Sequence, residues 1–136
     1  MIFETLAYHY TQSPPSKGVK IPDNVGARLC SIRCCAAHPF TGDNFENAKN
    51  HIFLNDLKAW SKVCKNVSVW DYEINFHNYL MPFPNFEVMR QNVALHYKLG
   101  TSHLFMQGNA EHSGEFGELR GYLCAKLLWE PQMTKA

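Results

Sequence analysis

Residues 66–85 read NVSVWDYEINFHNYLMPFPN, and this stretch decides the expected fold. It opens with a β-branched and aromatic run, ending at Trp70, that is typical of a buried strand. The run gives way to Asp71, Tyr72 and Glu73, and a loop rich in aromatic residues and asparagine follows. Because loops at the carboxyl ends of strands carry the chemistry of α/β enzymes, the stretch predicts a functional site there. The alternative is an ordinary strand exit in which Trp70 and Tyr72 only pack.

Segments with strand character alternate with segments of helical period along the rest of the chain. Runs of apolar and aromatic residues predict four strands, at about residues 3–10, 27–35, 67–72 and 102–107. Apolar residues three and four positions apart predict three helices, near residues 51–65, from Asn85 as the N-cap to Gly100, and between Glu115 and Pro131. This alternation predicts an α/β fold with parallel strands. A closed (β/α)8 barrel takes about 250 residues, so we expect either an open three-layer sheet or about half of a TIM barrel.

Composition restricts the class of protein. The chain has 136 residues, of which 46% are hydrophobic and 18% charged, and this predicts one globular domain. The net charge is +1 and no basic run is present, so we expect no nucleic-acid partner. No apolar run approaches the ~18 residues of a membrane helix, so no membrane association is expected. An aromatic fraction of 13% suits stacking on sugars and equally suits a large core.

A cluster of cysteines raises the question of a metal site. Cys30, Cys34 and Cys35 lie close to His38 in the sequence, but they lack a second Cys-x-x-Cys half and fit no standard zinc spacing. On a strand, Cys30 and Cys34 would share one face and act as small apolar residues. We therefore predict neither a metal nor another cofactor. Five histidines have no convergent partners in the sequence and are expected in surface or core positions, namely His9, His51, His96, His103 and His112.

Short motifs follow one another in a fixed order along the chain. They are Tyr8, Tyr10-Thr11, Arg33-Cys34, His38-Pro39, Trp70-Asp71-Tyr72, Asn75-Phe76, Tyr79-Leu80, Pro82, Pro84-Asn85, Leu104–Gly108, Leu119-Arg120, Tyr122-Leu123 and Ala125–Trp129. Together they resemble the bacterial family known as domain of unknown function 4838. That family is similar to glycoside hydrolases such as α-glucuronidases and hexosaminidases, and its catalytic region is a TIM barrel. The resemblance implies that residues 1–136 are a single partial domain, the C-terminal half of the (β/α)8 barrel with about strands five to eight.

The resemblance also carries a function. It implies a fragment of a carbohydrate-active protein that hydrolyses glycosidic bonds by carboxylate acid/base chemistry only in its full-length form. The fragment alone is expected to be inactive, because barrel sites draw residues from several strands. The family resemblance suggests export to the periplasm or cell surface, although this sequence shows no signal peptide. The alternative is a non-catalytic carbohydrate-binding scaffold or an interaction module.

The expected partners follow from the same resemblance and from the physics of sheet edges. One partner is a carbohydrate substrate or ligand. The other is either the missing N-terminal half of the barrel or a second copy of the chain, because half a barrel leaves two strand edges that invite pairing.

Two acids are the candidate catalytic residues. Glycosidases use two carboxyl groups, about 5–5.5 Å apart for retention and about 6.5–9.5 Å apart for inversion. Asp71 and Glu73 are two residues apart, so on an extended strand they point to the same face with Cα atoms about 6.6 Å apart. Asp71 is favoured because it lies inside the Trp-Asp-Tyr motif. The alternative is that Asp71 anchors its loop by hydrogen bonds to the backbone.

Aromatic and polar side chains at the strand ends are the candidate substrate-binding residues. Aromatic faces pack on the CH surfaces of sugars, while glutamine and histidine bind hydroxyl groups by hydrogen bonds. The set consists of Tyr8, Tyr10, His38, Trp70, Tyr72 and Gln107. Because side chains alternate along a strand, Trp70 and Asp71 cannot point to the same side. We therefore expect some of these residues to pack under helices.

Overall fold

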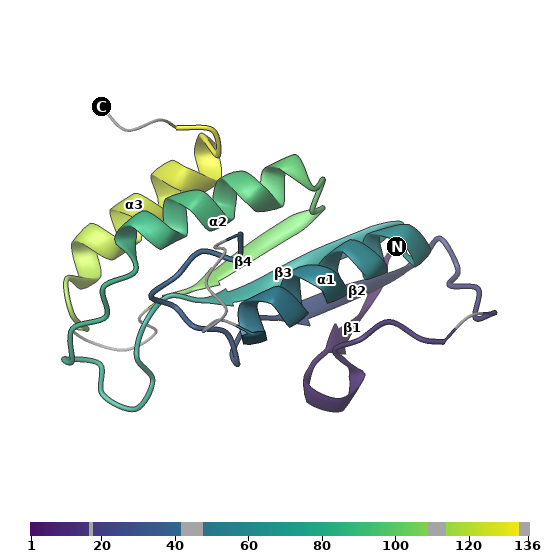
Figure 1. Ribbon diagram of the computed structural model, residues 1–136. Coiled ribbons are helices and arrows are strands. Elements are labelled where there is room, and N and C mark those ends of the chain that lie inside the picture. Colours follow the sequence, from purple (N-terminus) through teal and green to yellow (C-terminus); the bar gives the residue numbers. More distant parts are fainter. Residues whose placement is uncertain (17, 42–47, 109–113, 134–136) are drawn as a thin grey trace.

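The computed structural model describes residues 1–16, 18–41, 48–108 and 114–133. Strands and helices alternate within this part of the chain (Figure 1). The elements are β1 (Phe3–Ala7), the short 3-10 helix η1 (His9–Thr11), β2 (Val25–Cys30), α1 (Ala48–Val63), β3 (Asn66–Tyr72), α2 (Phe86–Lys98), β4 (His103–Gln107) and α3 (Gly117–Trp129). The predicted four strands and three α-helices are confirmed for the described residues.

The four strands form one parallel sheet in the order β1-β2-β3-β4. Each strand lies beside the strand that precedes it, and one row across the sheet joins Ala7, Leu29, Val69 and Leu104. The sheet is not closed, so β1 and β4 are its edges. Figure 1 shows α1 over β2 and β3, with α2 and α3 side by side over β4. The predicted parallel α/β fold is therefore confirmed, and this strand order is compatible with part of a barrel.

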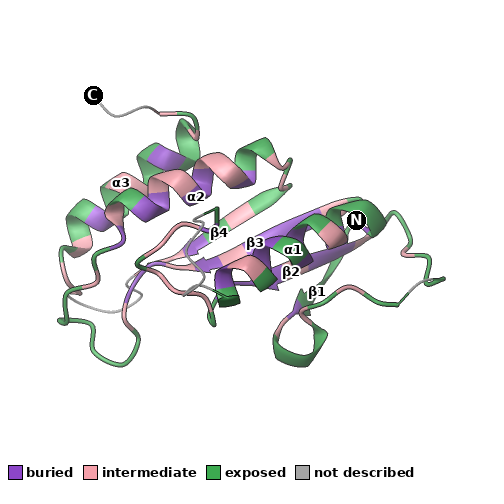
Figure 2. Ribbon diagram, in the orientation of Figure 1, coloured by how far each residue is buried: buried purple, intermediate pink, exposed green. Residues whose placement is uncertain are grey.

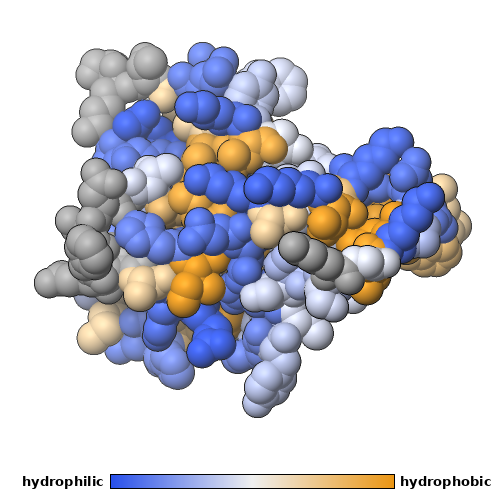
Figure 3. All heavy atoms as spheres, turned by 45° about the vertical axis from the view of Figure 1, so that its right-hand side comes forward, coloured by the Kyte–Doolittle hydropathy of each residue, from blue (hydrophilic) through white to orange (hydrophobic). Residues whose placement is uncertain are grey.

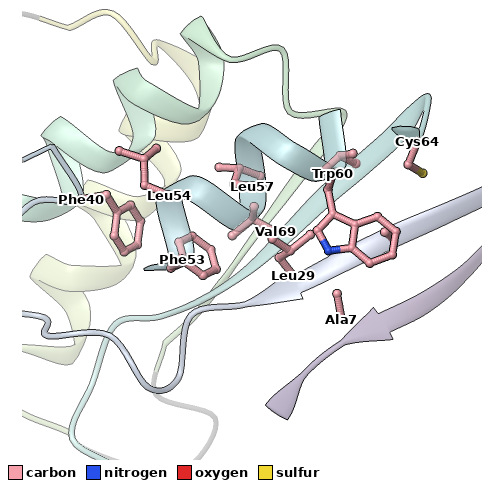
Figure 4. Close-up of a cluster of buried hydrophobic side chains, with 11 residues drawn as sticks. Ala7, Leu29, Phe40, Phe53, Leu54, Leu57, Trp60, Cys64 and Val69 are labelled. Atoms are coloured by element: carbon pink, nitrogen blue, oxygen red, sulfur yellow. The ribbon is translucent and has the colours of Figure 1, made fainter. Parts of the chain in front are cut away.

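The larger core lies between α1 and the sheet. Phe53, Leu57 and Trp60 recur at helical spacing on one side of α1 and are all buried. Figure 4 shows these side chains directed at the strands, where Leu29 and Val69 meet them. Burial is concentrated in β2 and β3, the two inner strands (Figure 2). Packing of this apolar stripe holds α1 on one face of the sheet.

A second core joins α2 and α3 to β4. Met89 and Val93 of α2 pack with Met106 of β4 and Leu127 of α3. The helix α2 ends at Lys98, and Gly100, two residues later, has a φ of 72°, a left-handed conformation that suits glycine. This packing places α2 and α3 on the same face of the sheet as α1, so two layers are formed and not the three-layer alternative.

The other face of the sheet is covered by no helix of the described residues. Ser68 donates a hydrogen bond to Glu4 at 2.8 Å and accepts one from Arg28 at 3.2 Å. Towards the carboxyl ends of the strands, the Trp70 ring packs edge-on against Phe105 with 5.0 Å between ring centroids. This face is called the open face below. It is polar near the amino ends of the strands and aromatic near their carboxyl ends.

Two predicted strand ends are wrong. The first strand ends at Ala7 and not near Tyr10, because the Thr11 hydroxyl accepts a hydrogen bond from the Tyr8 amide at 3.1 Å and folds the chain into η1. The second strand ends at Cys30, because Cys34 N–H turns back to bond the Ser31 carbonyl at 2.7 Å. Cys30 and Cys34 therefore do not share a strand face.

Candidate functional site

A cavity of about 270 Å³ lies at the carboxyl end of β3. Its walls come from the loop after β2, the loop after β3 and one side of α2. Asp71 and Glu73, the two candidate acids, both line it, as do Cys35, Tyr72 and Asn85. The carboxyl edge of a parallel sheet is where α/β proteins form their sites, so this cavity is the candidate functional site.

Asp71 lies on the helix side of the sheet and is buried. The Ser31 hydroxyl, at the end of β2, donates a hydrogen bond to its carboxylate. The Tyr72 backbone N–H donates a second bond to the same oxygen at 3.1 Å. The other carboxylate oxygen lies 4.0 Å from Nε2 of His96. Asp71 thus links the ends of β2 and β3 and brings a negative charge against α2.

Glu73 follows β3 directly and is only 3% exposed. Asn85 donates a hydrogen bond from Nδ2 to its carboxylate at 2.8 Å. Burial, together with the negative charge of Asp71, raises the pKa of Glu73 well above its usual range, although the positive charge of Arg120 and the bond from Asn85 oppose the rise. A carboxyl group in this setting retains a proton at a higher pH than an exposed glutamate does.

His96 is a buried histidine of α2 that faces Asp71. Its side chain is 1% exposed and its ring packs edge-on against Phe40 at 5.6 Å. Neither ring nitrogen has a hydrogen-bond partner among the described residues. Burial lowers the pKa of His96, and the charge of Asp71 acts in the opposite direction. His96 therefore lies behind Asp71, inside the protein, and is not among the residues that line the cavity.

The comparison with known families identifies the chain. The family described as Domain of unknown function (DUF4838) matches residues 1–136. The chain belongs to this family. No curated protein and no solved structure matches this DUF4838 chain.

The structure divides the predicted substrate-binding residues of the DUF4838 chain between several places. Trp70 and Gln107 lie on the open face, where the indole N–H donates a hydrogen bond to the Gln107 side-chain oxygen at 2.7 Å. Tyr72 stacks on Trp70 with ring centroids 6.2 Å apart and also lines the cavity. Some of the predicted substrate-binding residues were expected to pack under helices, but these three do not. Because side chains alternate along β3, it is Asp71 that packs under α2.

The remaining predicted residues lie elsewhere. Tyr8 is half-buried between the end of β1 and η1. Tyr10 is fully exposed on η1 and does not line the cavity with Asp71. His38 lies in the loop after β2, where Nδ1 is 3.3 Å from Sγ of Cys35. Only Tyr72 of the six predicted binding residues is among the residues that line the cavity.

Several functional contacts were missed by the sequence reasoning. Asn85 was expected to cap α2, but its side chain makes no cap hydrogen bond and binds Glu73 instead. Ser31 and Arg120 were not singled out, although the first contacts Asp71 and the second bonds Asn85. His96 was given a surface or core position without a partner. One available signal was the presence of a buried acid that needs polar neighbours.

The described residues can also be searched for a metal-binding cluster and for a membrane-spanning helix. Among them, no three His, Cys, Asp or Glu side chains gather closely enough to hold a metal ion. None of the helices in the same residues combines the length and the apolar character that crossing a membrane requires.

Proposed function

We propose that this DUF4838 chain is a fragment of a glycoside-hydrolase-like, carbohydrate-active protein with Asp71 and Glu73 as its carboxyl pair. The supporting observation is that both buried carboxyl groups line one cavity at the carboxyl ends of parallel strands. Barrel enzymes have their active sites at this end. Because such sites draw on strands around the whole ring, hydrolysis is assigned to the full-length protein and not to residues 1–136 alone.

The environments of Asp71 and Glu73 suit two different catalytic roles. Burial and the charge of Asp71 favour the protonated form of Glu73, so Glu73 is assigned the role of general acid that protonates the leaving glycosidic oxygen. Asp71 is assigned the role of the second carboxyl group, which acts as base towards water or as nucleophile at the sugar carbon. Glycosidic hydrolysis needs one carboxyl group that donates a proton and a second that acts as base or nucleophile.

Aromatic residues next to the acids support a sugar as the ligand. Trp70 and Tyr72 form a stacked pair at the carboxyl end of β3, and Gln107 is bound to the Trp70 indole. Tyr72 connects this pair to the cavity because it belongs to both. A sugar that stacks on the aromatic pair can therefore place a neighbouring glycosidic bond at the cavity mouth.

A second candidate function is a carbohydrate-binding scaffold without catalysis. The observation that favours it is that both acids already have partners inside the molecule, Ser31 for Asp71 and Asn85 for Glu73. Carboxyl groups held in this way can serve to fix the loops around a binding surface. In this case the aromatic pair binds sugar and no bond is cleaved.

The experiment is a glycan-array screen combined with hydrolysis assays on a DUF4838 protein that carries a complete barrel. The substitution Glu73→Gln, made at the corresponding position, is expected to lower kcat about 100-fold or more because general acid catalysis contributes factors of this size. The substitution Asp71→Asn is expected to abolish turnover, while the melting temperature remains nearly unchanged.

Glu118→Gln is the matched control for this experiment. Glu118 is an exposed glutamate on α3 that does not line the cavity, so the same chemical change there should leave turnover intact. Hydrolysis retained in both acid variants would exclude the carboxyl pair. Glycan binding without turnover in the unmodified protein would favour the scaffold.

A further inference from the structure

A cysteine and a histidine form a close pair in the loop that follows β2. Sγ of Cys35 lies 3.3 Å from Nδ1 of His38, within hydrogen-bond distance for sulfur. Both side chains are half-buried, and Cys35 also lines the cavity beside Asp71. A thiol next to an imidazole nitrogen can pass its proton to that nitrogen, which is the arrangement of an activated nucleophile.

The pair is held in place by one buried side chain of α1. Asn50 is 0% exposed and its Oδ1 accepts a hydrogen bond from the Cys35 N–H at 2.7 Å. Its Nδ2 donates to the carbonyls of Cys35 at 3.1 Å and of His38 at 3.0 Å. Because the same amide binds the backbone of both residues, the two backbone positions that carry the thiol and the imidazole are held together by the fold.

The other four cysteines are in environments that make their thiols less reactive as nucleophiles. Burial raises the pKa of Cys30 and of Cys34, and it raises the pKa of Cys124 to about 11. Cys64 is buried in the main core and donates to the Asn66 carbonyl at 3.3 Å. Thiols of this kind are poor nucleophiles because the thiolate form is suppressed or inaccessible.

We propose that Cys35 is a nucleophilic thiol, with His38 as its proton acceptor, and that it takes up small disulfides at the mouth of the cavity. The Cys35 proton moves from Sγ to Nδ1 of His38, and the thiolate attacks one sulfur of the disulfide. A new S–S bond forms to Cys35 while the S–S bond of the small molecule breaks. Its other half leaves as a thiolate, so the disulfide is the only co-reactant. The partner class is an oxidised low-molecular-weight thiol.

The test is reaction of the full chain with dithiobis-nitrobenzoate, followed by the absorbance of the released aromatic thiolate. At neutral pH we expect one thiol equivalent to react about tenfold or more faster than the others. Peptide mapping of the labelled, unmodified chain should place the first label on Cys35. This mapping needs no variant. A first label on any other cysteine would overturn the proposal.

Variants then separate the two members of the pair. Cys35→Ser should remove the fast phase, whereas Cys34→Ser, the same change at the adjacent residue, should retain it. His38→Gln should slow the fast phase about tenfold, because the proton acceptor is lost while the backbone contact with Asn50 remains. An unchanged rate in His38→Gln, with a native circular dichroism spectrum, would contradict the assigned role.

The pH profile of the fast phase distinguishes a proton acceptor from a structural residue. If His38 accepts the Cys35 proton, removing its imidazole in His38→Gln should change the pH dependence of the fast phase. Lys49 of α1 and Asp71 of β3 act electrostatically on the adjacent Cys34, and both are retained in the variant. Identical profiles for the two chains would count against the pair.

Discussion

At the scale of single residues, Glu73 is the end of a polar chain that crosses the helix layer. Asn85 connects Glu73 to Arg120, which is 1% exposed and also donates to the Phe83 carbonyl at 3.2 Å and to Glu115. A buried arginine is stable only where such partners satisfy its charge. The network therefore holds α3 and the loop after β3 together, and it opposes the rise in the pKa of Glu73 that burial and Asp71 cause.

The raised pKa of Glu73 predicts how stability changes with pH. The folded state binds the Glu73 proton more tightly than the unfolded state does, so this residue lowers stability as pH rises from about 4.5 through its folded pKa. Glu73→Gln keeps an oxygen for Asn85 and has no proton to lose. Its stability relative to the unmodified chain should therefore increase from acidic to neutral pH, by about 1.4 kcal/mol for each unit of raised pKa.

Urea unfolding at several pH values measures this difference. Glu118→Gln is the control, because it makes the same chemical change at an exposed position of α3. Comparing variant with unmodified chain cancels the opposite contribution of His96, whose pKa is lowered by burial. A constant difference for Glu73→Gln would show that Glu73 ionises as an ordinary surface glutamate does.

At the scale of elements, the local sequence pattern was sufficient to predict which helices and strands exist. It was not sufficient to predict where each of them begins and ends. The spacing of Phe53, Leu57 and Trp60 predicted the buried side of α1, and all three are in the core. The ends of β1 and β2 were misplaced because a side chain, Thr11, and a turn at Ser31 stop the strands. Such stops depend on hydrogen bonds that composition and periodicity do not encode.

The site was predictable only in part, for a similar reason. A strand exit with two acids is visible in the sequence, and Asp71 and Glu73 do line one cavity. Other members of the site come from distant parts of the chain: Ser31 lies 40 positions from Asp71, and Arg120 lies 35 positions from Asn85. Contacts between distant segments depend on how the helices pack, which one sequence read in isolation does not specify.

Leu57 tests the packing of α1 on the sheet. It is 0% exposed between the helix and the strands, so Leu57→Ala should lower the free energy of unfolding by about 2–5 kcal/mol through lost burial and a residual cavity. Ile52→Ala on the same helix is the matched control, because Ile52 is 55% exposed. Urea denaturation followed by circular dichroism gives both values. Equal losses in the two variants would mean that α1 does not pack on the sheet as described.

At the scale of the whole molecule, the described residues leave the sheet with two unpaired edge strands and an open face. Leu6 is 50% exposed and Phe105 is 47% exposed, and both belong to edge strands. Figure 3, which brings forward the side that carries β1, shows hydrophobic residues reaching the surface between hydrophilic ones. Apolar edge strands of this kind are templates for pairing with another chain.

We therefore predict self-association of the 136-residue chain. Light scattering should give a mass above that of a monomer, and Phe105→Lys should lower it because a charge on an edge strand opposes pairing. Tyr97→Lys is the matched control, since Tyr97 is 56% exposed and belongs to the helix α2, not to a strand. A monodisperse monomer of the unmodified chain would contradict the prediction.

The strands lie in the sheet in the same order as in the sequence, and this has a consequence for how such a fold can be extended. The first strand is one outer flank of the sheet and the last strand is the other. Tandem duplication of the gene would therefore set the last strand of one copy next to the first strand of the following copy. The strand order within each copy would stay the same. Twice four strands is the eight of a complete ring, so this architecture lends itself to assembly by repetition.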